Sequence, residues 1–309
     1  MTIPDEDLRA ALPASALIAG CGDIGLRVAT RLRALGREVT AIVRDRQKAA
    51  TLADAGIAVR IDDLDRPGDA GNWPLLFWFA PPPASGMRDT RLRGWLAAQR
   101  GHIARIVYIS TSAVYGDCGG RWIDEDAPLW PRSERGVRRV DAEHAWRDWC
   151  GEHDAETVIL RVPGIYGPGR LPVERLRKGL PIVRADESPY TNRIHADDLA
   201  VAALHAAAFG RNGRAYHIAD GAPTTMTDYF LRCARLLDLP PPPQLTMAEA
   251  RTALTPALLS FIDESKRLET RRLREELRFT PQYPNLDAGL PSCLPSSISP
   301  EEKPEGVLR

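Results

Sequence analysis

The sequence has few of the features that mark membrane, secreted or metal-binding proteins. No apolar run among the 309 residues approaches the ~20 residues that a membrane helix needs. The N-terminus has neither the basic start nor the apolar stretch of a signal peptide. Five scattered cysteines lack CxxC spacing, and six histidines contain no HxxxH pair. These absences predict a cytoplasmic protein without disulfides and without a metal site.

The sequence also has no net charge, because 41 Lys and Arg residues balance 41 Asp and Glu residues. Without a global field it has little to hold DNA, RNA or an anionic membrane, so we expect none of these as a partner. A composition of 44% hydrophobic and 27% charged residues is typical of a soluble globular protein with a large core. Lysine occurs only four times, so arginine supplies most of the positive charge.

Apolar runs typical of β-strands alternate with amphipathic stretches typical of helices through the first half of the chain. We expect strands at 16–19, 39–43, 57–61, 75–79, 106–109 and 158–162, and helices at 24–35, 46–55, 90–99 and 133–150. Strict alternation of this kind predicts an α/β fold with a doubly wound parallel sheet. Such sheets bind ligands at the carboxyl ends of their strands.

The second half has a different character. Residues 163–189 are rich in Gly, Pro and Arg, with room for one short helix. Beyond them we expect a strand at 215–218 and helices at 196–209, 226–239, 247–262 and 264–277. The pattern predicts a Rossmann domain at 14–165 completed by 190–220, a small, mostly helical substrate cap at 166–189 and 221–290, and a disordered Pro- and Ser-rich tail at 291–309.

The first expected strand runs directly into a glycine loop, Gly20-Cys21-Gly22-Asp23-Ile24-Gly25, and a helix follows. In this setting GxGxxG is the dinucleotide-binding pattern. Gly20 permits the tight turn, Gly22 lets a pyrophosphate approach the backbone, and Gly25 lets the helix pack on the strand. The helix start at Asp23 and Ile24 offers unpaired N–H groups to the phosphates. We therefore predict an NAD(P) site here.

The residue after the second expected strand bears on which nicotinamide cofactor binds. A carboxylate there would bind the ribose of NAD, but this chain has Arg44, which can pair with a 2′-phosphate and favours NADP. NAD stays open because Asp45 could turn inward. Asp63 and Leu64 after the third strand and Ala80 after the fourth complete the predicted cofactor site, although Asp63 could equally be a turn residue.

Four further segments follow in order at 110–116 (Ser-Thr-Ser-Ala-Val-Tyr-Gly), 160–169, 192–200 and 217–220. With the glycine loop they resemble the extended short-chain dehydrogenase/reductase family, the NAD-dependent epimerase/dehydratase group, over residues 15–290. The resemblance implies hydride exchange with a nicotinamide. It implies Thr111 as the hydroxyl that orients the reacting oxygen, with Ser112 as a substitute, and places Pro163 and Gly164 beside the nicotinamide. It also implies a homodimer.

The family's proton relay, Tyr-x-x-x-Lys, is missing. Aligned on Ala142-Glu143, the two positions hold Arg135 and Arg139. Arginine stays protonated below a pH of about 12, so Arg135 can hold an anion but cannot transfer a proton. Arg139 could still donate a hydrogen bond to the ribose. The chain is therefore similar to the atypical members of the superfamily, and its proton would come from water or a substitute donor.

Several arginines are expected around the cofactor. Arg135, Arg138, Arg184 and Arg193 predict a basic mouth suited to a phosphate, a carboxylate or a nucleotide diphosphate. Tyr166 and Arg193 are the candidate substrate contacts. Two functions remain open: an NADP-linked oxidoreductase, epimerase or dehydratase-like enzyme on a small sugar-type or anionic substrate, or a non-catalytic NADP(H)-binding redox sensor.

Overall fold

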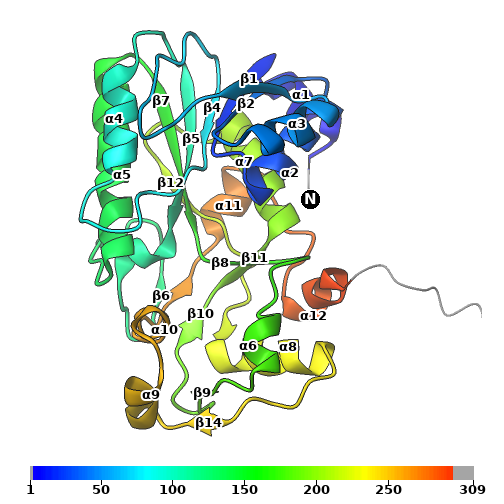
Figure 1. Cartoon of the computed structure of the whole chain (residues 1–309), viewed down its shortest axis with the longest axis vertical. Helices are drawn as coiled ribbons and strands as arrows, with labels where there is room; N and C mark the ends of the chain where they lie inside the picture. The colour runs from blue at the N-terminus through cyan, green and yellow to red at the C-terminus, as the bar shows by residue number, and fades with distance from the viewer. Residues whose placement is uncertain (1–2, 295–309) are drawn as a thin grey trace, which may run out of the picture.

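Seven strands form one parallel sheet in the order β12-β7-β5-β4-β1-β2-β3, and this confirms the predicted α/β class with a doubly wound sheet (Figure 1). The computed structural model describes residues 3–294. The strands are β1 (Ser15–Ala19), β2 (Glu38–Val43), β3 (Ala58–Ile61), β4 (Leu76–Trp78), β5 (Arg105–Thr111), β7 (Glu156–Val162) and β12 (Ala215–His217). The direction of chain progress reverses between β1 and β4, which is where such sheets bind ligands.

Helices cover both faces of this sheet (Figure 1). One face carries α1 (Asp5–Ala11), α2 (Asp23–Ala34), α3 (Arg46–Asp54) and α7 (Ala196–Phe209), and the other carries α4 (Thr90–Ala98) and α5 (Glu134–Glu152). The central strand β4 is consequently buried on both sides. Its Trp78 is fully buried and packs against Trp95 and Trp146, with ring centroids 4.9 and 5.7 Å away. No helix within residues 3–294 is long and apolar enough to cross a membrane.

A smaller, mostly helical lobe lies beyond the carboxyl ends of the strands, at the bottom of Figure 1, and has its own apolar core. Its elements are α6 (Val173–Arg177), β9 (Ile182–Val183), α8 (Met226–Leu236), β14 (Gln244–Leu245), α9 (Met247–Ala253), α10 (Pro256–Ile262) and α12 (Leu286–Gly289). Short strand pairs stand between the sheet and this lobe: β8 (Gly164–Tyr166) with β11 (Arg193–His195), and β10 (Tyr190–Thr191) with β13 (Thr224–Thr225). We call this lobe the cap.

Two helix predictions were wrong in the cap region. The helix expected at 247–262 is two helices, because Thr255 caps a new one whose first residue is Pro256; a proline disfavours helical backbone in the residue before it. The helix expected at 264–277 is helical only in α11 (Arg271–Glu275). Its beginning forms β15 (Arg267–Leu268), which pairs with the distant β6 (Trp122–Ile123). Local pattern cannot show such a partner.

The predicted tail at 291–309 starts too early. Residues 290–293 form a 3-10 helix, and Cys293 is buried in the cap core. Burial of apolar side chains fixes this turn although its sequence is Pro- and Ser-rich. The remainder of the predicted tail, 295–309, lies outside the described residues.

Candidate functional site

The glycine loop has the geometry that a dinucleotide needs. Gly20 follows β1 with a φ of +87°, and a Cβ there would lie 2.3 Å from the backbone nitrogen of Ala80. A Cβ on Gly25 would lie 3.1 Å from the Gly20 carbonyl oxygen, so glycine lets α2 pack closely on β1. A Cβ on Gly22 would meet no atom within 4 Å. The space over Gly22 is therefore open, and the loop fits a pyrophosphate.

A cavity of about 410 Å³ opens beside this loop, at the carboxyl ends of β1, β2 and β4. It is lined by half of the predicted cofactor residues: Gly20, Gly22, Arg44, Asp63, Leu64 and Ala80. Asp23 and Ile24 do not line it. The Asp23 carboxylate is bound to Arg27 at 2.9 Å and to Arg170 at 2.6 Å, and the Ile24 side chain packs in the core. Only their backbone could serve the phosphates.

Arg44 and Asp45, the two residues that bear on cofactor preference, both line this cavity. Asp45 is the N-cap of α3, and its carboxylate accepts a hydrogen bond from the backbone N–H of Lys48 at 2.7 Å. Arg44 is exposed and lines the cavity together with the Lys48 side chain. Asp63 does both things expected of it, since it lines the cavity and also accepts a turn hydrogen bond from Asp65 N–H at 3.1 Å.

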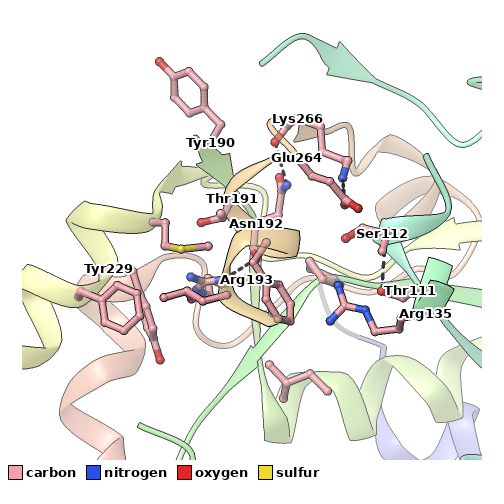
Figure 2. A pocket seen from close by; sticks show the side chains of 18 residues that line it. Thr111, Ser112, Arg135, Tyr190, Thr191, Asn192, Arg193, Tyr229, Glu264 and Lys266 are labelled. Atoms are coloured by element: carbon pink, nitrogen blue, oxygen red, sulfur yellow. Dashed lines mark hydrogen bonds and ion pairs between the residues drawn. The ribbon is translucent and has the colours of Figure 1, made fainter. Parts of the chain in front are cut away.

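A second pocket, of about 320 Å³, lies between the ends of β5 and β7 and the cap (Figure 2). It brings together predicted residues from four separate stretches of the chain: Thr111, Ser112, Arg135, Pro163, Gly164 and Arg193. Tyr166, the other predicted substrate contact, does not line it. Its side chain is fully buried, and its hydroxyl donates to the Asn285 carbonyl at 3.4 Å. The structure therefore does not bring Tyr166 to the site.

Thr111 ends β5, and its side chain begins the next turn. The Thr111 hydroxyl accepts a hydrogen bond from Ala113 N–H at 3.3 Å and caps the short 3-10 helix at Ser112–Tyr115. Directly before it, the Ser110 hydroxyl is buried and donates to Glu143 at 2.6 Å. The Thr111 and Ser112 hydroxyls at the pocket therefore lie on a turn that the hydrogen bond between Ser110 and Glu143 holds in place.

Arg135, at the family's tyrosine position, enters this pocket from α5. Its guanidinium lies 4.1 Å from the centroid of the Phe261 ring. Its Nε is buried without a hydrogen-bond partner among the described residues. Burial lowers the pKa of Arg135, although the charge of Glu264 acts in the opposite direction.

Arg193 approaches the same pocket from β11. Like Arg135, it lies over an aromatic ring and has a buried Nε without a hydrogen-bond partner among the described residues. Its guanidinium lies 4.1 Å from the centroid of Tyr229, and its one hydrogen bond goes to the carbonyl of Asn192 at 3.3 Å. Burial lowers its pKa. Within residues 3–294 neither Arg135 nor Arg193 forms an ion pair with a carboxylate. The pocket therefore holds two cations that an anionic ligand would compensate.

The other predicted arginines are engaged elsewhere. Arg139, at the family's lysine position, donates to the Tyr108 hydroxyl at 3.1 Å and to the Ile109 carbonyl at 2.8 Å. Arg138 binds the carbonyl oxygens of loop 84–86, and Arg184 pairs with carboxylates two and three residues away. The predicted basic mouth is thus reduced to Arg135 and Arg193. The ribose contact of Arg139 stays a prediction.

Sequence reasoning missed two charged residues of this pocket. Glu264 and Lys266 line it and form an ion pair of 2.8 Å, with exposed fractions of 8% and 4%. Both residues fall in the helix expected at 264–277, which gave no reason to place them at a pocket. Their spacing of two residues does not place side chains on one helix face, and Lys266 is one of only four lysines. These two signals could have pointed to an extended segment with a function.

Comparisons with known proteins bear on the family and on the fold. Residues 90–219 match the model of the NAD dependent epimerase/dehydratase family, and residues 16–68 match that of the TrkA-N domain. A 3-diazoavenalumate denitrifying reductase from Streptomyces sp is 27% identical over 309 residues, covering 89% of this chain and 98% of the relative. The family match over residues 90–219, together with these relatives, supports the extended short-chain dehydrogenase/reductase superfamily. This agrees with the family predicted from the motifs.

Further relatives in the superfamily cover either part or most of the chain. A dTDP-glucose 4,6-dehydratase from Actinoplanes sp. is 31% identical over 134 residues, 40% of this chain and 42% of the relative. A functionally unknown conserved protein from Silicibacter pomeroyi superposes with a TM-score of 0.76 at 29% identity, covering 91% and 98% of the two chains. MoeE5 in complex with UDP-glucose and NAD superposes with a TM-score of 0.71 at 23% identity, covering 90% and 97%. The last likeness shows the fold alone.

Proposed function

We propose that the protein is a nicotinamide-dependent reductase that prefers NADP(H) and acts on a small, planar carboxylate. The proposal assigns residues 14–165 and 190–220 to cofactor binding and the cap to the substrate. Within the expected cap range 221–290, α11 is an exception, because Leu273 packs in the core of the main sheet. One observation carries it: Arg135 and Arg193, two half-buried arginines without carboxylate ion pairs in the described chain, face the same pocket as the Thr111 hydroxyl. We also expect a homodimer through α4 and α5, as in the family.

The preference for NADP(H) is supported at the end of β2. Arg44 and Lys48 both line the cavity beside the glycine loop, and the Asp45 carboxylate, which lines it too, accepts the cap hydrogen bond from Lys48 N–H. A 2′-phosphate would find two cations there, whereas the Asp45 carboxylate that could bind a ribose diol already accepts a hydrogen bond. NAD remains the alternative, because MoeE5 was solved with NAD.

The substrate class is supported by the pocket walls. The two guanidinium groups lie over the aromatic rings of Phe261 and Tyr229, and Phe230 lines the same pocket. Aromatic faces favour a flat ligand, and the arginines favour an anionic group on it. The Streptomyces relative is a 3-diazoavenalumate denitrifying reductase, and this name describes a reductase that removes nitrogen from a carboxylate. A sugar nucleotide is the second candidate, because MoeE5 was solved with UDP-glucose.

Each residue of the pocket would have a separate role in such a reduction. A bound nicotinamide would supply the hydride. Arg193 would hold the carboxylate, and Thr111, supported by Ser112, would orient the reacting group. Arg135 and Arg139 stand where the family has its proton relay, so these positions donate no proton at neutral pH.

Two kinds of group can be reduced without a proton from these two positions. A carbonyl would take its proton from water after the hydride reaches carbon. A carbon that bears a diazonium group needs no proton: the hydride forms the new C–H bond, the C–N bond breaks, and its electron pair leaves with N₂. The second case fits a site that retains hydride chemistry and has lost the acid.

The test is NADPH oxidation with probes that differ only in the carboxylate. We expect the protein to oxidise NADPH above the protein-free background with 4-carboxybenzaldehyde or benzenediazonium-4-carboxylate. With benzaldehyde or benzenediazonium, NADPH oxidation should not exceed the background. Arg193→Met should abolish the difference, and Arg177→Met, on an exposed cap residue, should leave it. Tight NADPH binding without consumption of any probe, UDP-glucose included, would support the redox-sensor alternative instead.

A further inference from the structure

We propose that Glu264, held by Lys266, is a second recognition point in the Thr111 pocket that accepts a hydrogen bond from a hydroxyl group of the substrate. The substrate would then be a hydroxylated aromatic carboxylate, with its anionic end on Arg193 and its hydroxyl on Glu264. This inference rests on the proposed function and narrows its substrate class. Nothing in the family's motifs assigns a role to either residue.

The Glu264 carboxylate is fixed on a rigid support. Lys266 Nζ lies 2.8 Å from Glu264 Oε2. The backbone around the pair is held from two sides, because Asn192 Nδ2 donates to the Lys266 carbonyl at 3.0 Å and Asp117 accepts from Ser265 N–H at 2.9 Å. The loop therefore presents the carboxylate in one place, which is what a recognition group needs.

The second oxygen of this carboxylate lacks a partner. Glu264 Oε1 is buried and accepts no hydrogen bond from any described residue, although the residue lines the pocket. Figure 2 shows the carboxylate reaching toward Ser112. A buried charged acceptor without a donor costs free energy that a ligand hydroxyl would recover. The Glu264 carboxylate at the pocket wall therefore has an acceptor oxygen that no described residue uses.

The charges of the pocket orient a ligand that carries both groups. Arg193 approaches from the side of Tyr229, and Glu264 lies on the other side of the pocket, near Ser112 (Figure 2). The negative charge of Glu264 repels a carboxylate and accepts from a hydroxyl, whereas Arg193 attracts the carboxylate. The aromatic body of the ligand would then lie between them, in front of Thr111.

The test is equilibrium binding by calorimetry, in the presence of NADP, of two probes that differ by one hydroxyl. We expect 4-hydroxycinnamate to bind the wild-type protein roughly 10- to 100-fold more tightly than cinnamate, the range for a hydrogen bond to a charged group. The double variant Glu264→Leu/Lys266→Met replaces the pair by apolar side chains and should bind both probes alike, with the affinity for cinnamate kept. Asp263→Asn, a change in the same loop, should keep the wild-type preference.

Each outcome of this test either supports or overturns the inference. Equal affinities in the wild type, or a preference that survives in the double variant, overturn the inference. If the double variant does not fold by circular dichroism, Glu264→Gln takes its place and must reduce the preference. Cinnamate binding without hydroxyl preference leaves the proposed function standing, because it needs only Arg193. A hydroxyl preference without any NADPH oxidation overturns the proposed function and leaves this subsite. Failure to bind either probe overturns the inference.

Discussion

Glu143 and Arg161 form an ion pair that is closed off from solvent directly behind the Thr111 turn. Arg161 Nη2 lies 2.8 Å from Glu143 Oε2, and the carboxylate is fully buried. The other carboxylate oxygen accepts from Ser110, and Arg161 also donates to the Tyr115 hydroxyl at 2.7 Å. The pair thus joins β5, β7 and α5 at the end of the sheet where the hydroxyls of the site stand.

Removing one partner of this pair should destabilise the fold strongly. Glu143→Ala leaves a buried guanidinium uncompensated, and we expect it to lower the free energy of unfolding by about 3–5 kcal/mol. Urea denaturation measures the loss. The matched control is Glu275→Ala, which removes an exposed ion pair with Arg271 and should cost less than about 1 kcal/mol. Similar small losses in both variants would contradict the assigned role.

His217 should make the protein less stable in acid. Burial lowers its pKa from the ordinary 6.5 to about 3, and the ring lies between the Tyr115 hydroxyl and the Glu269 carbonyl. Below pH 6.5 the unfolded chain binds a proton there and the folded chain does not, so stability falls as the pH drops from 6.5 toward 3. Between pH 7 and pH 5 this histidine should account for a loss of about 2 kcal/mol.

The measurement is urea unfolding at both pH values for the wild type, His217→Gln and His102→Gln. The His217 variant should lose less stability on acidification than the wild type, whatever its stability at pH 7. His102 is exposed, and its variant should follow the wild type. Parallel losses in all three proteins would show that His217 is not the titrating group.

Asp220 should make anion binding depend on pH. Burial raises its pKa to about 7, and its backbone N–H donates to the Arg193 carbonyl at 2.8 Å. Above pH 7 the carboxylate becomes charged near the Arg193 guanidinium and competes with an anionic ligand. We expect the dissociation constant of cinnamate to rise up to roughly tenfold between pH 6 and pH 8. Asp220→Asn should remove the dependence, and an equal rise in wild type and variant would refute it.

Arg44 should decide the cofactor preference. Arg44→Asp removes the cation beside the expected 2′-phosphate and offers a carboxylate to a ribose diol. The ratio of NADPH to NADH affinity should fall by roughly 10- to 100-fold, measured by nicotinamide fluorescence. Arg46→Asp is the control, because Arg46 does not line the cavity and carries the same charge. An unchanged ratio in Arg44→Asp would place the 2′-position elsewhere.

The parts of the site that follow from local pattern could be predicted from the sequence. Gly20, Gly22 and Gly25 stand at fixed positions between a strand and a helix, and Thr111 ends an apolar strand, so their places depend only on neighbours along the chain. The sheet follows for the same reason, since each buried strand carries its own apolar run.

The remainder of the site depends on contacts between distant segments. Arg135, Arg138, Arg184 and Arg193 look alike in the sequence, but only packing shows which of them find carbonyl or carboxylate partners. Glu264 enters the pocket because the segment after it pairs with β6, and no local signal announces that pairing. Tyr166 shows the opposite error. Its motif predicted a place at the site, but its side chain packs under α12 and does not reach the pocket.

A crystal structure with NADP and 4-carboxybenzaldehyde tests the proposed reductase site most directly. We predict the nicotinamide ring between Thr111 and the Pro163–Gly164 segment, with its C4 within about 4 Å of the aldehyde carbon. The carboxylate should lie on Arg193. A nicotinamide bound away from Thr111, or a cap side chain filling the space where the aldehyde should lie, would contradict a reductase and favour a protein that only senses its cofactor.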